Sequence, residues 1–518
     1  MPPEADPNTH RSDADRALLE RARGLAGERA ARSLRLSGAA ALWLRAGDDP
    51  ALMVLARPGD PVLDRFDGTV ADGGDGLRLL VGGTTPGNAA ALRAELPNLR
   101  PVPLGLATSA GFGDRLGLAT PGHALALERT GAAGMVAPVF AQQSIREMTR
   151  TRRAPQEVVD DATWGAFAAG WRLPVGADAD HQKTADDVRA CLAAGFTLFT
   201  VDPGEHVDDA AERADAAELR ARLERLPWRE LEDDWEGLKR RLLGAPLDLG
   251  DRELAISEEE LTRAAVKYGA AIAHTLSLYR VLAASGAPFE LELSVDETAY
   301  PTTLPEHAYV AAELRRLGVA VVSLAPRFVG RFEKGVDFRP DATGDLATLA
   351  ATLEGHAAIA RSMGPYKLSL HSGSDKFSVY PLIAAATGGL VHLKTAGTSY
   401  LEALRVAAVH APDLFRQVLA IGHERFEVDR KSYLIGARLE AVPRPGDLRD
   451  ADLPGLLDDD GARQVLHVTF GSALDAVGAE LKRLLRERDV AHEEGLARHF
   501  ARHLEPFVPY AAQPPRPG

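Results

Sequence analysis

Residues 366–377 read YKLSLHSGSDKF, a short apolar run that passes directly into polar and charged side chains. Runs of this kind recur between about residues 104 and 410, with segments of helical composition between them. Strands that are apolar on both faces are typical of a buried parallel sheet, and parallel neighbours need long crossovers, usually helices. The other runs are VPLGLATS (102–109), MVAPVFAQ (135–142), RLPVGADA (172–179), FTLFTVD (196–202), FELELSV (289–295), VAVVSLAP (319–326) and LVHLKTA (390–396).

Eight strand–helix units in one series predict a TIM (β/α)8 barrel over residues 104–410. A doubly wound open sheet is the alternative, because a sequence does not show whether the sheet closes. After the fourth strand, residues 204–285 are too long for one crossover and predict a helical insertion, in which Ser257 and Glu260 form a capping box. Flanking the barrel, we expect a polar tail and charged helix (1–36), a small α/β lead-in (37–103) and a C-terminal helical extension (411–518).

The overall composition favours a soluble protein that acts on a small molecule. The 518 residues carry a formal charge of −14, which argues against broad binding to nucleic acid or anionic membranes. The single cysteine, Cys191, has no internal disulfide partner, and residues 1–16 lack the features of a secretory signal. No apolar stretch is long enough to span a bilayer. These features predict a cytoplasmic location and leave the oligomeric state open.

Polar side chains follow most of the predicted strands, at the end of a barrel where active sites lie. Asp296 and Glu297 are neighbours, so on a strand at most one of them would face the barrel mouth. Imidazoles and carboxylates that converge at such a mouth suit a divalent cation of unknown identity. The strand-end residues are Asp178, Asp180, His181, Asp202, Asp296, Glu297, Arg327, His371, Ser372, Ser374, Asp375, Lys376, His392 and Lys394.

Two glycine-rich segments resemble nucleotide-binding motifs without matching them. GFGDRLG (111–117) has one residue too many between its second and third glycines, and GGTTPGN (82–88) lacks the lysine of a phosphate loop. We interpret both as turns. The sequence therefore indicates no dinucleotide site.

Three long segments resemble the tagaturonate epimerase family, also called tagaturonate/fructuronate epimerases: SVDETAYPTTLPEHAYVAAELRRLGVAVVSLAPRFVGRFEKGVDF (294–338), GPYKLSLHSGSDKFSVYP (364–381) and HLKTAGTSYLEALRV (392–406). The similarity continues upstream in APVFAQQSIREMTRT (137–151) and GADADHQKTADDV (176–188) and covers most of residues 105–410. It implies interconversion of the ketouronates D-tagaturonate and D-fructuronate, in hexuronate catabolism, on a barrel that uses a divalent metal. The resemblance implies functional roles for Asp180, His181, Glu297 and His371.

One departure from the family concerns the end of the third strand. The family pattern is closer to GADH, whereas this chain reads GADADH (176–181). The two additional residues leave open whether Asp178 or Asp180 occupies the functional position.

The two ketouronates differ at the carbon β to the ketone, whose hydrogen is not acidic. Transient oxidation by a nicotinamide and retro-aldol cleavage followed by re-addition both remain possible routes, and the absence of a dinucleotide motif favours the second. It needs a Lewis acid and an acid/base pair. We expect His181 and His371 to bind the cation with His392 or Asp202, Asp180 and Glu297 to exchange the proton, and Arg327, Lys376 and Lys394 to hold the substrate.

Three alternatives remain open at this point. Lys394 would form a Schiff base with the ketone if the chemistry is covalent. The chain would be another metal-dependent sugar-acid isomerase or aldolase if the barrel supports a different reaction. It would be a non-catalytic sugar-acid binding protein if the pocket is retained without turnover.

Overall fold

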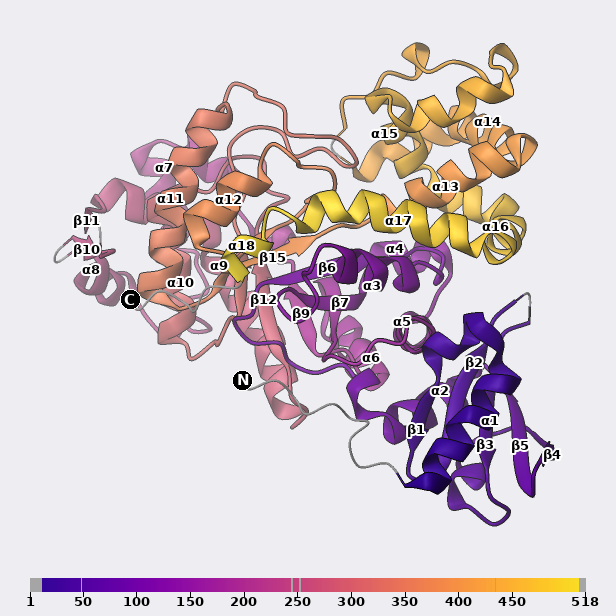
Figure 1. The fold of residues 1–518 in the computed structure, drawn as a ribbon. Coiled ribbons are helices and arrows are strands. Elements are labelled where there is room, and N and C mark those ends of the chain that lie inside the picture. The colour runs from indigo at the N-terminus through magenta and orange to yellow at the C-terminus, as the bar shows by residue number, and fades with distance from the viewer. Residues whose placement is uncertain (1–11, 48, 244–245, 251–252, 434, 512–518) are drawn as a thin grey trace.

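Eight parallel strands close into a barrel at the centre of the computed structural model, which describes residues 12–511 except 48, 244–245, 251–252 and 434 (Figure 1). Each strand pairs with the next along the chain, and the last pairs with the first through His392 and Ser109. The predicted barrel is thus confirmed, and the open sheet is excluded. The strands are β6 (Ser109–Gly113), β7 (Ala137–Ser144), β8 (Gly176–Gln182), β9 (Leu198–Val201), β12 (Glu290–Ser294), β13 (Ser323–Ala325), β14 (Lys367–Leu370) and β15 (Val391–Lys394).

The first barrel strand lies further along the chain than predicted. VPLGLATS overlaps β6 only at Ser109, and Ala110 with the first three residues of GFGDRLG, a segment interpreted as a turn, forms the rest of the strand. A Cβ at Gly113 would lie 2.8 Å from Cα of Ala396. Glycine is therefore required in this strand because another backbone approaches closely, which is a common reason for glycine inside a sheet.

Helices follow the strands and form the outer wall of the barrel. The fourth connection carries the predicted helical insertion, which ends in the long helix α9 (Glu258–Ala284) behind the capping box of Ser257 and Glu260. Before it come α7 (Ala216–Leu223), α8 (Trp235–Leu242) and a hairpin of β10 (Leu247–Asp248) and β11 (Glu253–Leu254). The other wall helices are α3 (Thr120–Arg129), α5 (Pro155–Ala168), α6 (Ala185–Ala194), α10 (Leu304–Arg316), α11 (Leu346–Met363), α12 (Tyr380–Thr387) and α13 (Thr398–His410).

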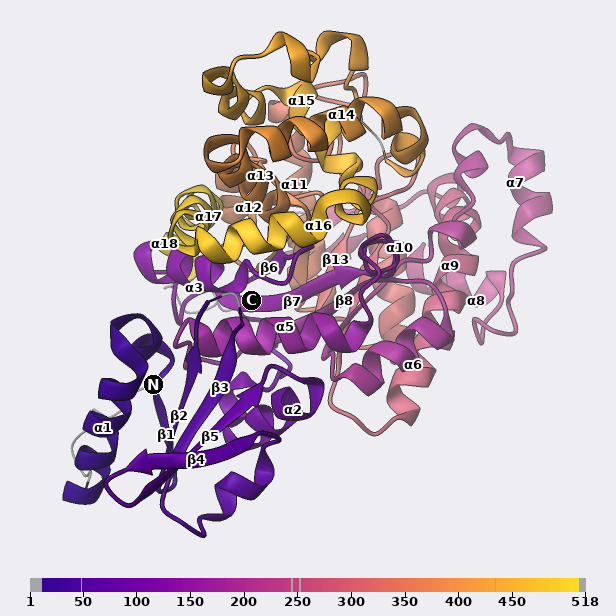
Figure 2. The same ribbon diagram turned by 90° about the vertical axis from the view of Figure 1, so that its right-hand side faces the viewer.

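An antiparallel sheet of order β1-β2-β3-β5-β4 precedes the barrel. Helix α1 (Asp13–Ala30) packs on one face of it through Leu18 and Ala22, and α2 (Pro86–Glu95) lies on the other side, towards α5 (Figure 2). Residues 1–11 of the predicted polar tail lie outside the described residues. The strands are β1 (Arg35–Ser37), β2 (Ala40–Arg45), β3 (Ala51–Ala56), β4 (Thr69–Gly74) and β5 (Leu77–Gly83).

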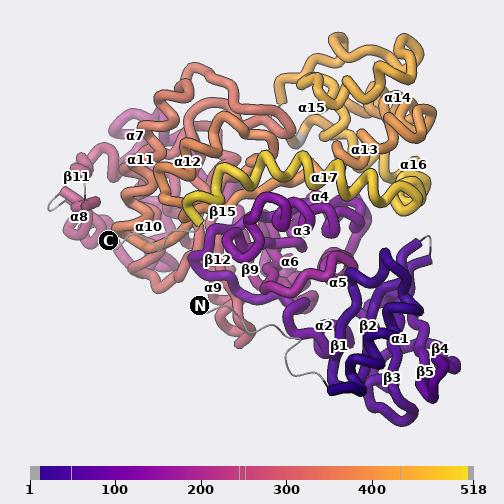
Figure 3. The backbone as a smooth tube through the Cα atoms, viewed as in Figure 1, coloured from indigo at the N-terminus to yellow at the C-terminus, as the bar shows by residue number. Residues whose placement is uncertain are grey.

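A helical unit with its own hydrophobic core follows the barrel and rests against its mouth. That core joins α13 to the later helices through residues such as Phe415, Leu466 and Phe470. Figure 3 traces α17 from this unit back across α3 to α18, beside the barrel. Residues 512–518 of the predicted extension lie outside the described part. The helices are α14 (Pro412–Asp429), α15 (Asp460–Val468), α16 (Phe470–Glu487), α17 (Asp489–Leu504) and α18 (Val508–Ala511).

A search of the described residues finds no helix that combines the length and the apolar character needed to cross a membrane. Every described helix is accounted for by packing on the barrel, on the antiparallel sheet or within the C-terminal unit.

Candidate active site

Strand β8 brings two carboxylates and an imidazole to the barrel mouth. Asp178 and Asp180 are two residues apart, so both point to the barrel interior, and both are buried. The pairing of β8 with β9 is interrupted after Ala179, and His181 has a φ of +52°. This bulge places the His181 ring beside Asp180, with Nδ1 2.9 Å from Oδ1. Both aspartates are therefore inside the barrel, and Asp180 is the one paired with the histidine.

His371 follows β14 and is held between two carboxylates. Its Nε2 lies 2.5 Å from Oε1 of Glu292, and its Nδ1 lies 3.1 Å from Oδ1 of Asp296. The rings of His371 and His181 have their centroids 5.2 Å apart. Burial and Lys394 oppose protonation of His371, but Asp296 and Glu292 raise its pKa above the ordinary value.

Asp296 and Glu297 both approach His181, contrary to the expectation that only one would face the mouth. Oδ1 of Asp296 and Oε1 of Glu297 lie 3.8 and 3.9 Å from Nε2 of His181. The reason is that β12 ends at Ser294, so the alternation of a strand no longer applies to these residues. Oε1 of Glu297 also accepts from Arg146 at 3.3 Å.

Asp180, His181 and His371 offer one ligand atom each within 4.8 Å of one another, an arrangement that suits a divalent cation. Nε2 of His181 is buried and has no hydrogen-bond partner among the described residues. Burial opposes protonation of this ring, yet Asp180, Glu297 and Asp296 raise the pKa of His181 to about 10. The same concentration of negative charge favours a bound cation.

Two other predicted ligands differ in their placement. Asp202 forms a second possible group with His181 and Glu297, although its Oδ1 already accepts from the backbone N–H of Gly204 at 2.9 Å. His392 lies deeper in the barrel, fully buried, with Nδ1 2.8 Å from Oγ of Ser109. It belongs to none of the possible ligand groups found among the described residues.

Lys394 is enclosed by carboxylates below the mouth. Its Nζ lies 2.8, 2.7 and 2.9 Å from Asp178, Asp180 and Glu292, and it also contacts Thr200. Burial opposes the charge, but these carboxylates raise the pKa of Lys394 well above its ordinary value. A Schiff base requires a neutral amine that can reach the ketone, so this environment disfavours that alternative.

Lys376 binds backbone carbonyl oxygens inside the protein rather than a substrate at the barrel mouth. Its fully buried Nζ donates to the carbonyl oxygens of Glu333 at 2.7 Å, Ser374 at 2.9 Å and Val336. It therefore joins the loop after β14 to the loop after β13. Its predicted contact with substrate has no support in this geometry.

Glu292 is the main residue that sequence reasoning missed. It is fully buried in the middle of β12 and contacts both His371 and Lys394. A signal was present in FELELSV, because Glu290 and Glu292 are two apart in an otherwise apolar strand and must share a face. A carboxylate on the inner face of a barrel strand needs a buried partner.

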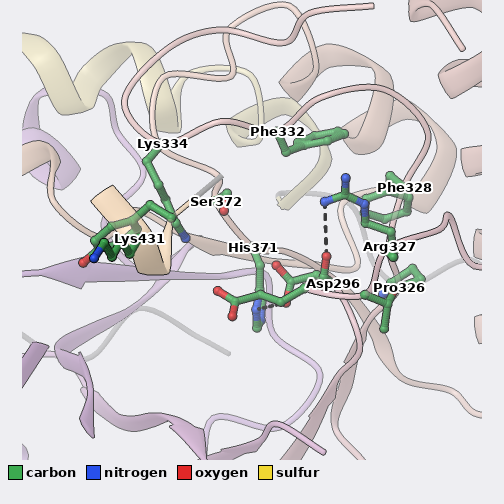
Figure 4. A pocket seen from close by; sticks show the side chains of 13 residues that line it. Asp296, Pro326, Arg327, Phe328, Phe332, Lys334, His371, Ser372 and Lys431 are labelled. Carbon is green, nitrogen blue, oxygen red and sulfur yellow. Dashed lines mark hydrogen bonds and ion pairs between the residues drawn. The ribbon is translucent and has the colours of Figure 1, made fainter. Parts of the chain in front are cut away.

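A cavity of about 500 Å³ opens in front of His371 and Asp296 (Figure 4). Arg327, predicted to bind substrate, lies in its wall with Phe328 and Phe332, and its guanidinium donates to the backbone oxygen of Asp296 at 3.3 Å. Among the described residues, no carboxylate lies within ion-pairing distance of Arg327. The remaining lining residues are Glu297, Thr298, Ala299, Pro326, Lys334, Ser372, Lys431 and Tyr433.

Asp375, His499 and His503 form a third possible ligand group, but its polar atoms are already paired. Asp375 accepts from Arg463 at 2.7 Å and from His499 at 2.5 Å, and its backbone N–H donates to His503 at 3.0 Å. These bonds tie the loop after β14 to α15 and α17. Their evident role is to fix that loop.

Known proteins resemble this chain over most of its length. Residues 43–507 match the profile of a family described as tagaturonate epimerase. A tagaturonate/fructuronate epimerase from Thermotoga maritima is 44% identical over 420 residues, which is 81% of this chain and 84% of that protein.

Two crystal structures of the fructuronate-tagaturonate epimerase from Cohnella laeviribosi are also similar. The form complexed with one glycerol is 32% identical with a TM-score of 0.86, and the native form is 33% identical with a TM-score of 0.85. Each alignment covers 96% of this chain and 99% of the other. The similarity therefore includes the N-terminal sheet and the C-terminal helices as well as the barrel.

Proposed function

The chain belongs to the tagaturonate epimerase family, and from this we propose that it is an isomerase that interconverts D-tagaturonate and D-fructuronate in the cavity beside His371. The observation that carries the proposal is the composition of that cavity. One side holds two carboxylates and an imidazole, Asp296, Glu297 and His371, and the wall includes Arg327 without an acidic partner among the described residues. An anionic, polyhydroxylated substrate provides oxygen atoms for both kinds of group.

The reaction must invert the carbon β to the ketone. In a retro-aldol route, a base takes the proton of the β-hydroxyl, the bond between the α and β carbons breaks, and its electron pair moves to the ketone oxygen. The β carbon becomes an aldehyde, which turns and is attacked on its other face. The new alkoxide then takes up a proton, so the sequence is balanced and neutral in redox terms.

We propose Asp180, His181 and His371 as the residues that hold a divalent cation. The unpartnered, buried Nε2 of His181 and the surrounding carboxylates fit such an ion. When bound, the cation supplies positive charge to stabilise the negative charge that develops on the ketone oxygen. Asp180 replaces His392 as the third ligand of the sequence-based hypothesis, and Asp202 remains the alternative.

Glu297 and Asp296 then serve as the proton acceptor and donor. Both line the cavity, and Glu297 is the more accessible, with 39% of its side chain exposed. Within the described residues, Oδ2 of Asp296 makes no hydrogen bond, which leaves it free for a substrate hydroxyl. Asp180 was expected in this role, but it is not among the residues that line the cavity.

The test is to incubate the purified protein with D-fructuronate and to resolve the products by chromatography, with and without a chelator. We expect D-tagaturonate to form, chelation to stop the reaction, and a divalent ion to restore it. In D2O, the retro-aldol route leaves no deuterium on the inverted carbon, so deuterium there would refute it. Full activity after exhaustive chelation would refute the cation.

A further inference from the structure

Two lysines line the cavity on the side away from Arg327. Figure 4 shows Lys334 and Lys431 together at one side, Arg327 at the opposite side, and His371 with Asp296 between them. We infer that Lys334 and Lys431 form the subsite that receives the carboxylate of the substrate. The inference rests on the proposed function and assigns Arg327 to the hydroxyl or ketone oxygens instead.

The first argument is charge. Within the described residues, neither Lys334 nor Lys431 has a carboxylate at ion-pairing distance, although the chain carries an excess of acidic residues. Of the two cavity carboxylates, Glu297 is already paired with Arg146 at 3.3 Å, and Asp296 contacts His371 at 3.1 Å. Lys334 is partly buried, and an ammonium group in such a place is stabilised by an anion. The carboxylate of a ketouronate is the anion that the proposed reaction supplies.

The second argument is the cationic surroundings of the same wall. Tyr433, which lines the cavity beside Lys431, has the Arg146 guanidinium 4.8 Å and the Arg150 guanidinium 5.0 Å from its ring centre. Arg150 also donates to the Tyr433 hydroxyl at 3.4 Å. Positive charge is therefore concentrated on this side of the cavity, where it raises the local concentration of an anionic substrate.

The third argument is that two distant parts of the chain, which contact each other, supply the two lysines. Lys334 lies in the loop after β13, and Lys431 follows α14 in the C-terminal unit. Glu333, which is fully buried, accepts from the N–H of Gly436 at 3.1 Å and from Gln464 at 2.9 Å. These bonds tie the residue next to Lys334 to the C-terminal unit, from which Lys431 comes.

Arg327 is less suited to the carboxylate. Its guanidinium already donates to the backbone oxygen of Asp296, which places it next to the acid/base residues. Its contact with the backbone of Asp296, which we assign to proton transfer, places it at the reacting end of the substrate, where it suits the hydroxyl or ketone oxygens.

The experiment compares a charged and a neutral substrate in matched variants. Lys334→Met and Lys431→Met remove the charges, and Lys239→Met, at the surface beside Glu236, is the control. Each enzyme is assayed with D-fructuronate and with D-fructose, in which CH2OH replaces the carboxylate. We expect each cavity variant to lose about 10- to 100-fold in kcat/KM for D-fructuronate, mainly through KM, because a charged hydrogen bond is lost.

The same variants should keep their rate with D-fructose, and Lys239→Met should match the unaltered protein with both substrates. An equal loss with both sugars, or no loss with D-fructuronate, would overturn the subsite. If D-fructose is not turned over, inhibition by D-gluconate and by D-glucitol replaces it, and only the D-gluconate constant should weaken.

Failure of the subsite and failure of the proposed function give different results. If the unaltered protein does not epimerise D-fructuronate, the proposed function is wrong. D-Gluconate binding, measured by calorimetry, then still tests the subsite, because Lys431→Met should weaken it at least tenfold. Unchanged binding of D-gluconate would refute the subsite in that case too.

Discussion

Glu292→Gln is the substitution that tests the buried network most directly. It keeps the size of the side chain and removes a charge that contacts Nε2 of His371 at 2.5 Å and Nζ of Lys394 at 2.9 Å. Lys394 retains Asp178 and Asp180, and His371 retains Asp296, so neither cation loses all of its acidic partners. The variant should therefore fold.

The magnitude follows from the distances. At 2.9 Å and an effective dielectric constant of about 20, the attraction between Glu292 and Lys394 is about 6 kcal/mol. Removing the carboxylate also removes its desolvation cost of several kcal/mol, so we expect a net loss of about 2–3 kcal/mol in the free energy of unfolding. Because His371 loses the group that orients it, cation affinity or activity should fall about 10- to 100-fold.

Two measurements on the purified variant check this, namely unfolding in denaturant and kcat/KM for D-fructuronate at several concentrations of divalent ion. Glu290→Gln is the control, since Glu290 lies on the same strand but contacts the backbone N–H of Gly105. Normal activity and cation affinity in Glu292→Gln would refute the reasoning, as would an equal loss in Glu290→Gln.

Three further predictions concern other parts of the molecule. Glu297→Gln should lower kcat by about 100- to 10,000-fold, with a smaller effect on KM, in steady-state kinetics. A kcat close to that of the unaltered protein would exclude Glu297 as the residue that transfers the proton. Arg463→Met should destabilise the protein by about 3 kcal/mol, measured by denaturant unfolding, because it removes the guanidinium that pairs with the buried Asp375 at 2.7 Å; unchanged stability would contradict this. Burial lowers the pKa of His356 to about 4, so below pH 6.5 the unfolded chain binds a proton that the folded one does not. Because of this histidine, the free energy of unfolding should fall by about 2 kcal/mol from pH 7 to pH 5. His356→Gln should reduce that fall by the same amount, as measured by unfolding curves at both pH values.

Much of the barrel was predictable from local sequence. Buried parallel strands and their crossover helices leave patterns within one element, and the helix after Ser257 begins at its capping box as predicted. The first strand was misplaced because Gly113 is explained by a contact with Ala396, which is distant in sequence.

The candidate site was predictable only in part. The sequence indicated which strand ends carry imidazoles and carboxylates, and the structure brings Asp180, His181, Glu297 and His371 together. It did not indicate that Glu292 faces His371, because that contact crosses from one strand to another. It also did not indicate that His392 lies deeper than the mouth.

By itself, the sequence determined that polar groups gather at one end of a barrel, because strand periodicity and strand endings are local properties. Only the tertiary structure decided which of those groups meet. The bulge at His181 turns one ring, the backbone carbonyls around Lys376 remove one lysine from the pocket, and the packing of α14 brings Lys431 to the other wall. Each of these depends on a contact between residues far apart in the chain, and a local pattern carries no information about such contacts.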